Sequence, residues 1–155
     1  MASRSRTLAA AITTAINAWA SKPAGVTASR VRSVTHLLQS MPQATPGAIA
    51  VIASRADDTS NRGEVSEDIT VGIVVIGNAE SEAAAASDSW DDFTESLMDY
   101  MRASSTFRSI SVGAISAARK AVNLVTIADA DLLDEHEIFV SAIEVTYHAS
   151  AGARS

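Results

Sequence analysis

The sequence predicts an α+β protein, in which two main helices pack on a mostly antiparallel or mixed sheet of about four to five strands. Strand-like runs of valine and isoleucine recur along the chain, and two stretches have apolar residues at helical spacing. The 155 residues are 47% apolar and include only three prolines. We therefore expect a single domain over residues 1–155, with a core at about 7–148 and flexible ends at 1–5 and 149–155.

An amphipathic helix is expected near the N-terminus. Its apolar stripe recurs at i, i+4, i+8 and i+11 and consists of Leu8, Ile12, Ile16 and Trp19. Pro23 and Gly25 would end this helix. Residues 26–34 then predict a strand that carries Arg30 and Arg32 on one face.

The middle of the chain predicts two strands joined by a long polar loop. Ala48–Ser54 and Ile69–Ile76 are rich in valine and isoleucine, whereas residues 55–66 contain turn-forming residues at almost every position. A loop of that length in a compact domain is often functional, so it is a candidate contact arm, with simple flexibility as the equal alternative.

The second helix has the clearest pattern. Its buried stripe is expected to consist of Trp90, Phe93, Leu97 and Met101. Ser89 can cap the N-terminus, and Asp91, Asp92 and Arg102 suit the two ends of the helix dipole. The alanine run at 83–86 either extends the helix backward or forms a linker.

Three strands are expected in the last third. Residues 110–115 and 122–127 flank the basic pair Arg119-Lys120, and a helical turn at 129–135 precedes a final strand at 137–148. This strand has apolar residues on both faces, so it needs cover on both sides. It lies either in the middle of the sheet or at an edge that another chain covers.

The aromatic residues of these periodic faces are expected in the core rather than in contacts with partners. They are Trp19, Trp90, Phe139 and Tyr147.

Charge is distributed unevenly along the sequence. The net charge is −6, yet residues 1–55 carry six basic residues and no acid, and all 18 acidic residues follow. If the halves reach different surfaces, the molecule has a positive and a negative end, which suits head-to-tail assembly. Alternatively, folding interleaves the halves and mixes the signs.

Several classes of function lack their signatures. The chain has no cysteine, which excludes disulfides and thiolate metal sites and fits a reducing cytoplasm. It has neither an apolar run that could cross a bilayer nor a secretory signal. Scattered arginines in an acidic chain do not predict a nucleic-acid interface.

Catalytic and metal signatures are also missing. The acids at 129–137 lack the glycine and glutamate spacing of a calcium loop, and His36, His136 and His148 lack metal-ligand spacing. We therefore expect no enzyme, with no catalytic, cofactor-binding or metal-binding residue.

Three segments resemble the tail-terminator and neck (tail-completion) proteins of long-tailed bacteriophages. They are Asp68–Val75, the acidic helix Trp90–Met101 and, above all, Leu132–Tyr147. In that family an acidic turn leads into a strand of the form Phe-x-Ser-x-Ile/Leu-x-Leu/Val-Thr-Tyr. The matching positions are Phe139, Ser141, Ile143, Val145, Thr146 and Tyr147.

The resemblance implies a structural protein of the virion, in the tail or neck, assembled in the host cytoplasm. It would form a ring, usually a hexamer, at the head-proximal end of the tail. Its partners would be other copies of itself, the tail tube protein and the head-tail connector or stopper protein. DNA would pass through the channel without specific binding, and no membrane would be involved.

Sheet edges and the loop at 55–66 are the candidate contacts with neighbours or the tube. The charged candidates are Arg30, Arg32, Arg55, Asp57, Asp58, Arg62 and Glu64. Two alternatives stay open, namely another neck or head-completion adaptor and a small ligand-binding or enzymatic domain. The last would require the histidines and the acids at 129–137 to meet in one cleft.

Overall fold

The computed structural model describes residues 4–20, 22, 26–31, 47–61, 64–78, 84–112, 115–126 and 138–152. The elements follow in the order α1 (Arg4–Asn17), β1 (Thr27–Arg30), β2 (Gly47–Asn61), β3 (Glu64–Asn78), α3 (Ala84–Ala103), α4 (Ser105–Arg108), β4 (Ser109–Val112), β5 (Ile115–Thr126) and β6 (Ile138–Gly152).

The strands of these residues form one mixed sheet in the order β1-β2-β3-β6-β5-β4. Strand β1 runs parallel to β2, and every other neighbouring pair is antiparallel. The α+β class is confirmed, but the sheet has six strands rather than four to five. Strands β1 and β4 lie within or beside the expected strands at 26–34 and 110–115, and they form the two edges of the sheet.

Strand β6 lies in the middle of the sheet, between β3 and β5, so the first of the two predicted positions is confirmed. It pairs with β3 from Ile138 to Gly152. The ladder therefore includes residues 149–152, which were predicted as a flexible end, and Ala149 is buried. At the other end of the chain, α1 already begins at Arg4.

The predicted loop at 55–66 is wrong over most of its length. Strand β2 continues to Asn61, β3 begins at Glu64, and these two residues pair. The polar stretch stays extended because β6 pairs with the same part of β3 from the other side, up to Glu64 opposite Gly152. A β-bulge between Arg55 and Asp58 takes up one extra residue of β2.

The basic pair Arg119-Lys120 also lies in a strand, not between two strands. Strand β5 begins at Ile115, and β4 supplies the strand before it. The predicted helical turn at 129–135 lies outside the described residues.

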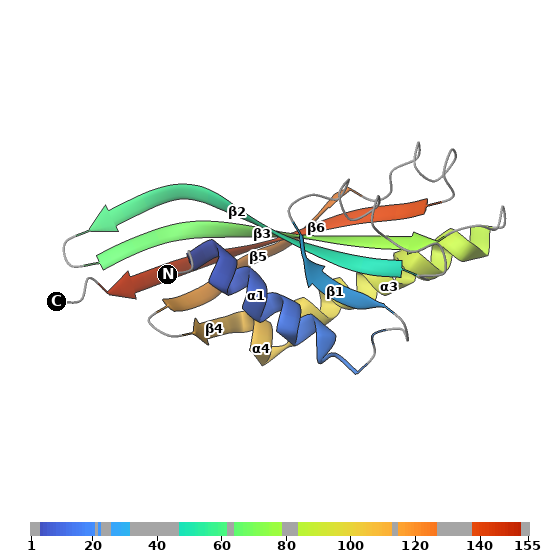
Figure 1. The fold of residues 1–155 in the computed structure, drawn as a ribbon, viewed down its shortest axis with the longest axis horizontal. Coiled ribbons are helices and arrows are strands. Elements are labelled where there is room, and N and C mark those ends of the chain that lie inside the picture. The colour runs from blue at the N-terminus through green and yellow to red at the C-terminus, as the bar shows by residue number, and fades with distance from the viewer. Residues whose placement is uncertain are drawn as a thin grey trace.

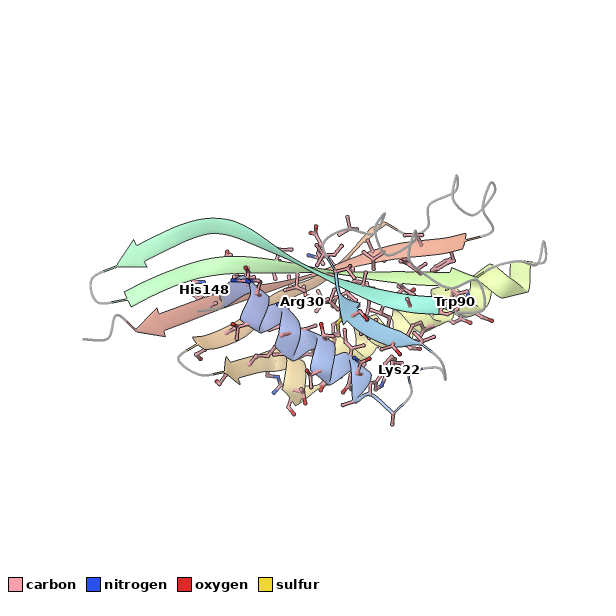
Figure 2. The ribbon with its side chains drawn as sticks, in the orientation of Figure 1. Lys22, Arg30, Trp90 and His148 are labelled. Carbon is pink, nitrogen blue, oxygen red and sulfur yellow. The ribbon has the colours of Figure 1, made fainter. Side chains whose placement is uncertain are left out.

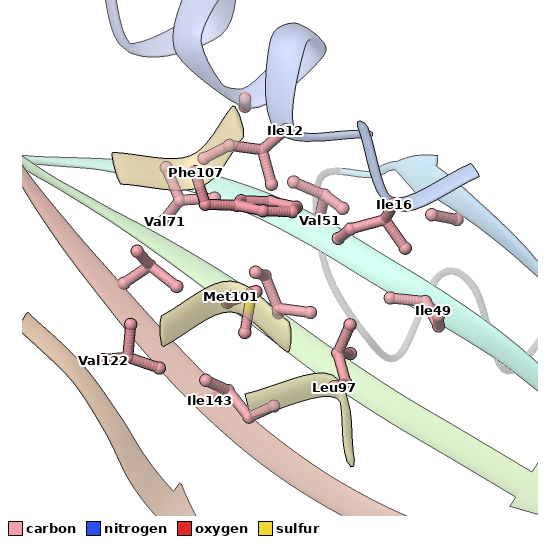
Figure 3. Close-up of a cluster of buried hydrophobic side chains, with 14 of the residues drawn as sticks. Ile12, Ile16, Ile49, Val51, Val71, Leu97, Met101, Phe107, Val122 and Ile143 are labelled. Atoms are coloured by element: carbon pink, nitrogen blue, oxygen red, sulfur yellow. The ribbon is translucent and has the colours of Figure 1, made fainter. Parts of the chain in front are cut away.

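The three helices cover one face of the sheet (Figure 1). Helix α1 buries Leu8, Ile12 and Ile16 against this face, while Trp19 follows the end of the helix. Helix α3 begins at Ala84, so residues 84–86 of the alanine run belong to the helix and Ser89 is not its cap. Residues of α1, α3, α4 and the sheet meet in one core, shown in Figure 3.

The aromatic residues belong to that core, as predicted. Phe139 and Tyr147 are buried, and half-buried Trp19 and Trp90 pack against the same cluster. The Trp19 ring stacks on Tyr100 at a centroid distance of 4.8 Å. The Tyr147 hydroxyl donates a hydrogen bond of 2.6 Å to the carbonyl of Phe107 in α4.

Trp90 lies directly on the sheet because two glycines leave room for its indole. A Cβ atom at Gly77 would come within 2.1 Å of the ring, and one at Gly47 within 2.2 Å. These two glycines are paired residues of β2 and β3, so the sheet has no side chains beneath the indole at this point.

Candidate functional site

The sheet face opposite the helices carries a charged cluster from three strands. Asp68 of β3 accepts hydrogen bonds of 2.8 Å from the Lys120 ammonium of β5 and 2.9 Å from Nδ1 of His148 in β6. The side chains of Asp68, Lys120 and His148 are 34%, 52% and 48% exposed. Figure 2 shows His148 toward the end of the sheet opposite Trp90.

Irregular pairing in β5 brings Lys120 into the cluster. Arg119 pairs with Tyr147 and Ala121 with Thr146, so Lys120 is the extra residue of a β-bulge. A bulge turns the side chain of its extra residue away from the regular alternation. His148 and Asp68 are direct cross-strand partners.

The electrostatics of the cluster are those of a surface ion pair. The hydrogen bond from Lys120, with a smaller contribution from His148, lowers the pKa of the Asp68 carboxyl. Because the groups are a third to a half exposed, solvent screens them and they contribute at most about 1 kcal/mol. The cluster links three strands, but the described residues contain no group of three His, Asp or Glu side chains that could hold a metal.

Further along the strands, this face of the sheet becomes apolar and buried. Thr70 and Thr146 lie side by side with hydroxyl oxygens 3.4 Å apart. Beyond them, a second buried cluster consists of Ala50, Val74, Ile76 and Val140.

The β1 edge of the sheet is closed by a side chain. The Asn17 amide at the end of α1 donates to the carbonyl of Ala28 at 2.9 Å, and its oxygen accepts from the Ala28 amide at 2.8 Å. Asn17 thus occupies the place that a further strand would take next to β1.

The opposite edge is open. Strand β4 pairs with β5 only from Ile115 to Ala118. From Arg119 to Thr126, β5 pairs with β6 alone among the described strands. On this stretch one guanidinium of α3 caps a single carbonyl, since Arg102 donates to Val122 at 3.1 Å.

The open β5 edge also carries the exposed apolar side chains. Leu124 is 41% and Val125 is 54% exposed, and they are the two exposed large apolar residues in the described part of the chain. Val125 is the extra residue of a second bulge, because Leu124 pairs with Ile143 and Thr126 with Ala142. The bulge explains why this side chain is not covered by the regular packing.

Strand β2 has an open stretch as well. Strand β1 pairs with β2 from Ala48 to Val51, and the amide of Val31 donates to the carbonyl of Val51. From Ile52 to Asn61, β2 pairs with β3 alone among the described strands.

Charges on the helical side are separated. The described residues of α1 and β1 include Arg6 and Arg30 and no acid. The outer side of α3 is acidic instead, with the exposed residues Asp88, Asp91, Asp92, Glu95 and Asp99. Arg102 lies 4.0 Å from Asp99.

Those predicted contact residues that belong to the described part of the chain lie in strands. Arg30 is exposed in β1 and donates to the carbonyl of Arg6 at 3.3 Å. Arg55, Asp57 and Asp58 lie in the open stretch of β2, and Glu64 begins β3. Arg32 and Arg62 lie outside the described residues, as do His36, His136 and the acids at 129–137.

Neither the charged cluster nor the open β5 edge was predicted from the sequence. Asp68, Lys120 and His148 are far apart in the chain, and only the pairing of β3, β6 and β5 brings them together. Residues 122–127 predicted a strand, but their pattern does not show which neighbouring strand would be missing.

No protein-family model matches the chain, and no curated protein is similar to it. None of the helices in the described part of the chain is long and apolar enough to span a membrane.

Proposed function

We propose that this protein is a structural subunit of a bacteriophage virion, a tail terminator that forms a ring at the head-proximal end of the tail. The ring would end growth of the tail tube and join the tail to the head connector. The observation that carries the proposal is a pair of strand edges on opposite sides of one sheet, β2 from Ile52 and β5 from Arg119, which pair with no further strand among the described residues.

Open edges on opposite sides suit a ring. A strand edge with unpaired backbone groups pairs readily with another strand. When two different surfaces of a subunit meet, the contact is heterologous, and such contacts close into a ring if the rotation allows. The exposed Leu124 and Val125 give the β5 edge apolar area to bury.

The separation of charge also supports the proposal. A ring between a tail tube and a head connector has two unlike neighbours, and the basic α1 and acidic α3 would give its surfaces different charge. Acids such as Asp91 and Glu95 are candidates to face the channel. There they would repel the phosphates of passing DNA, which would then gain no counterion release on the wall.

A neck or head-completion adaptor is the alternative within the same class. Such a protein would use the same edges and differ in its partner and in the number of copies. The distinction rests on where the ring sits in the particle.

The test is the mass and position of the assembly. Light scattering of the purified protein measures whether it forms a ring, and electron microscopy compares tails made with and without the protein. We expect tails of uniform length with a ring at the head-proximal end, and overlong, headless tubes without it. A protein that stays monomeric and never joins a tube would contradict the proposal.

A further inference from the structure

The two open stretches occupy complementary positions in the sheet. Along the strands, Leu124 of β5 is level with Ile143, Ile73 and Val51. Strand β1 pairs with the outer edge of β2 between Ala48 and Val51, and β4 pairs with the outer edge of β5 between Ile115 and Ala118. The short edge strands therefore lie at diagonal corners of the sheet (Figure 1). At the other two corners β2 and β5 have no further described strand beside them, and we call these two places the notches.

The strand directions suit pairing between copies. Each step from β2 to β3, β6 and β5 is antiparallel, so β5 runs opposite to β2. A second copy in the same orientation thus presents its β2 antiparallel to β5 of the first. If it is shifted along the strands, its open β2 stretch enters the β5 notch and its β1 passes beyond Thr126.

Two strand edges of the next copy, β1 and β2, could in principle pair with β5, and two observations favour β2. The β1 edge is occupied by Asn17 and offers no free backbone at Ala28. In sequence, the open β2 stretch contains Asp57 and Asp58 beside one base, Arg55, whereas the open β5 stretch contains Arg119 and Lys120 and no acid, so the two stretches differ in charge. Pairing would also cover Leu124 and Val125.

We propose that copies of this chain join edge to edge, with β2 from Ile52 to Asn61 of one copy pairing antiparallel with β5 from Arg119 to Thr126 of the next. The sheet would then continue from subunit to subunit. This inference deepens the proposed function, since it names the contact that would build the ring.

Disulfide cross-linking tests the contact, because the chain has no cysteine of its own. One variant carries Asn123→Cys in the open β5 stretch. A second set carries single cysteines at successive β2 positions from Ser54 to Thr59. Each variant is oxidised by itself in one sample, and a mixture of the reduced β5 variant with one reduced β2 variant is oxidised in another. Both oxidations use a concentration at which light scattering of the unmodified protein shows assembly.

We expect disulfide-linked dimers only in the mixtures, and only with β2 cysteines on the face of the sheet that carries residue 123. These are alternate positions on each side of the bulge between Arg55 and Asp58, because successive side chains of a regular strand point to opposite faces. Dimers of Asn123→Cys alone would overturn the proposal in favour of a two-fold β5 contact. Rings without cross-links at any position would also overturn it while leaving the proposed ring intact. Absence of any assembly, by itself or on tubes, would overturn both.

A charge at the open edge gives a second readout. Val125→Lys places an ammonium where the neighbouring copy would bury the side chain, and a lysine at an edge disfavours strand pairing. We expect the concentration for half-assembly to rise about tenfold or more, since each tenfold change corresponds to about 1.4 kcal/mol. Ser96→Lys, exposed on α3, adds the same charge away from the edge and should leave assembly unchanged.

Both variants must first show the circular dichroism and melting temperature of the unmodified protein. A folded Val125→Lys variant that assembles normally would overturn the edge contact. If it instead fails to fold, the cross-linking pattern decides the question.

Discussion

Ile143 and Glu144 are neighbours in β6, yet they lie in opposite surroundings. Ile143 is fully buried in the core under the helices, whereas Glu144 is exposed on the other face of the sheet. The same contrast holds along much of β3 and β6, where alternate residues face the helices. The helix-covered face holds most of the core, whereas the other face is exposed around Glu144 and His148 and buries a smaller apolar cluster around Ile76.

The largest expected effect comes from this adjacent pair. Ile143→Ala removes buried methyl groups and leaves a cavity, so it should lower the free energy of unfolding by about 2 to 5 kcal/mol. Glu144→Ala should change it by about 0.5 kcal/mol or less. Urea denaturation of the two variants measures both values. Equal losses would show that the open face is covered in solution.

Two glycines of β3 give the next test. A Cβ atom at Gly77 would overlap the Trp90 indole at 2.1 Å, so Gly77→Ala should cost about 1 to 3 kcal/mol through overpacking. At Gly72, on the open face, the nearest atom is the Ile52 carbonyl oxygen at 3.7 Å, an ordinary contact. Gly72→Ala should therefore be neutral or slightly stabilising. Thermal unfolding of each variant gives the comparison.

A smaller effect is expected from the hydroxyl of Tyr147. Burial raises the pKa of this phenol, which remains protonated and donates to the Phe107 carbonyl. Tyr147→Phe leaves that carbonyl without its partner and should cost about 1 to 2 kcal/mol. Thr146→Val, the matched change on the open face, should cost less, because water can replace the contact with Thr70. A greater loss of unfolding free energy in Thr146→Val than in Tyr147→Phe would contradict the expectation that contacts on the helix-covered face contribute more to stability.

The smallest effect is expected at Asp68. Its pKa is lowered in the folded protein, so its contribution to stability is present above the ordinary value of 3.8 and is lost as the pH falls below that value. Asp68→Asn should therefore reduce stability by less than about 1 kcal/mol at pH 7. It should also flatten the stability profile on the acid side. The measurement is the free energy of unfolding against pH. If Asp68→Asn and the unmodified protein lose stability equally below pH 3.8, the ion pair does not persist in solution.

The covered face could be predicted from the sequence and the open face could not. The stripes of α1 and α3 and the buried strands follow from spacing alone, because burial in one core imposes a period on each element. This is why Leu8, Ile12, Leu97 and Met101 were placed correctly.

Features that depend on strand pairing could not be predicted from the sequence. The polar stretch after Arg55 reads as a loop because its residues favour turns, and only the β6 ladder keeps it extended. The cluster around Asp68 needs both a register and a bulge at Lys120, and no local pattern encodes either. The acids at 129–137 lie outside the described residues.

The long strands have a mechanical consequence. Strands β2, β3 and β6 are each 15 residues long, which corresponds to roughly 50 Å at about 3.3 Å per residue. A force along these strands would load the hydrogen bonds of the ladder in shear, so that many must break together rather than one after another. Strand β6 is held in this way by neighbours on both sides. The subunit would therefore resist tension along its length far better than peeling from an edge.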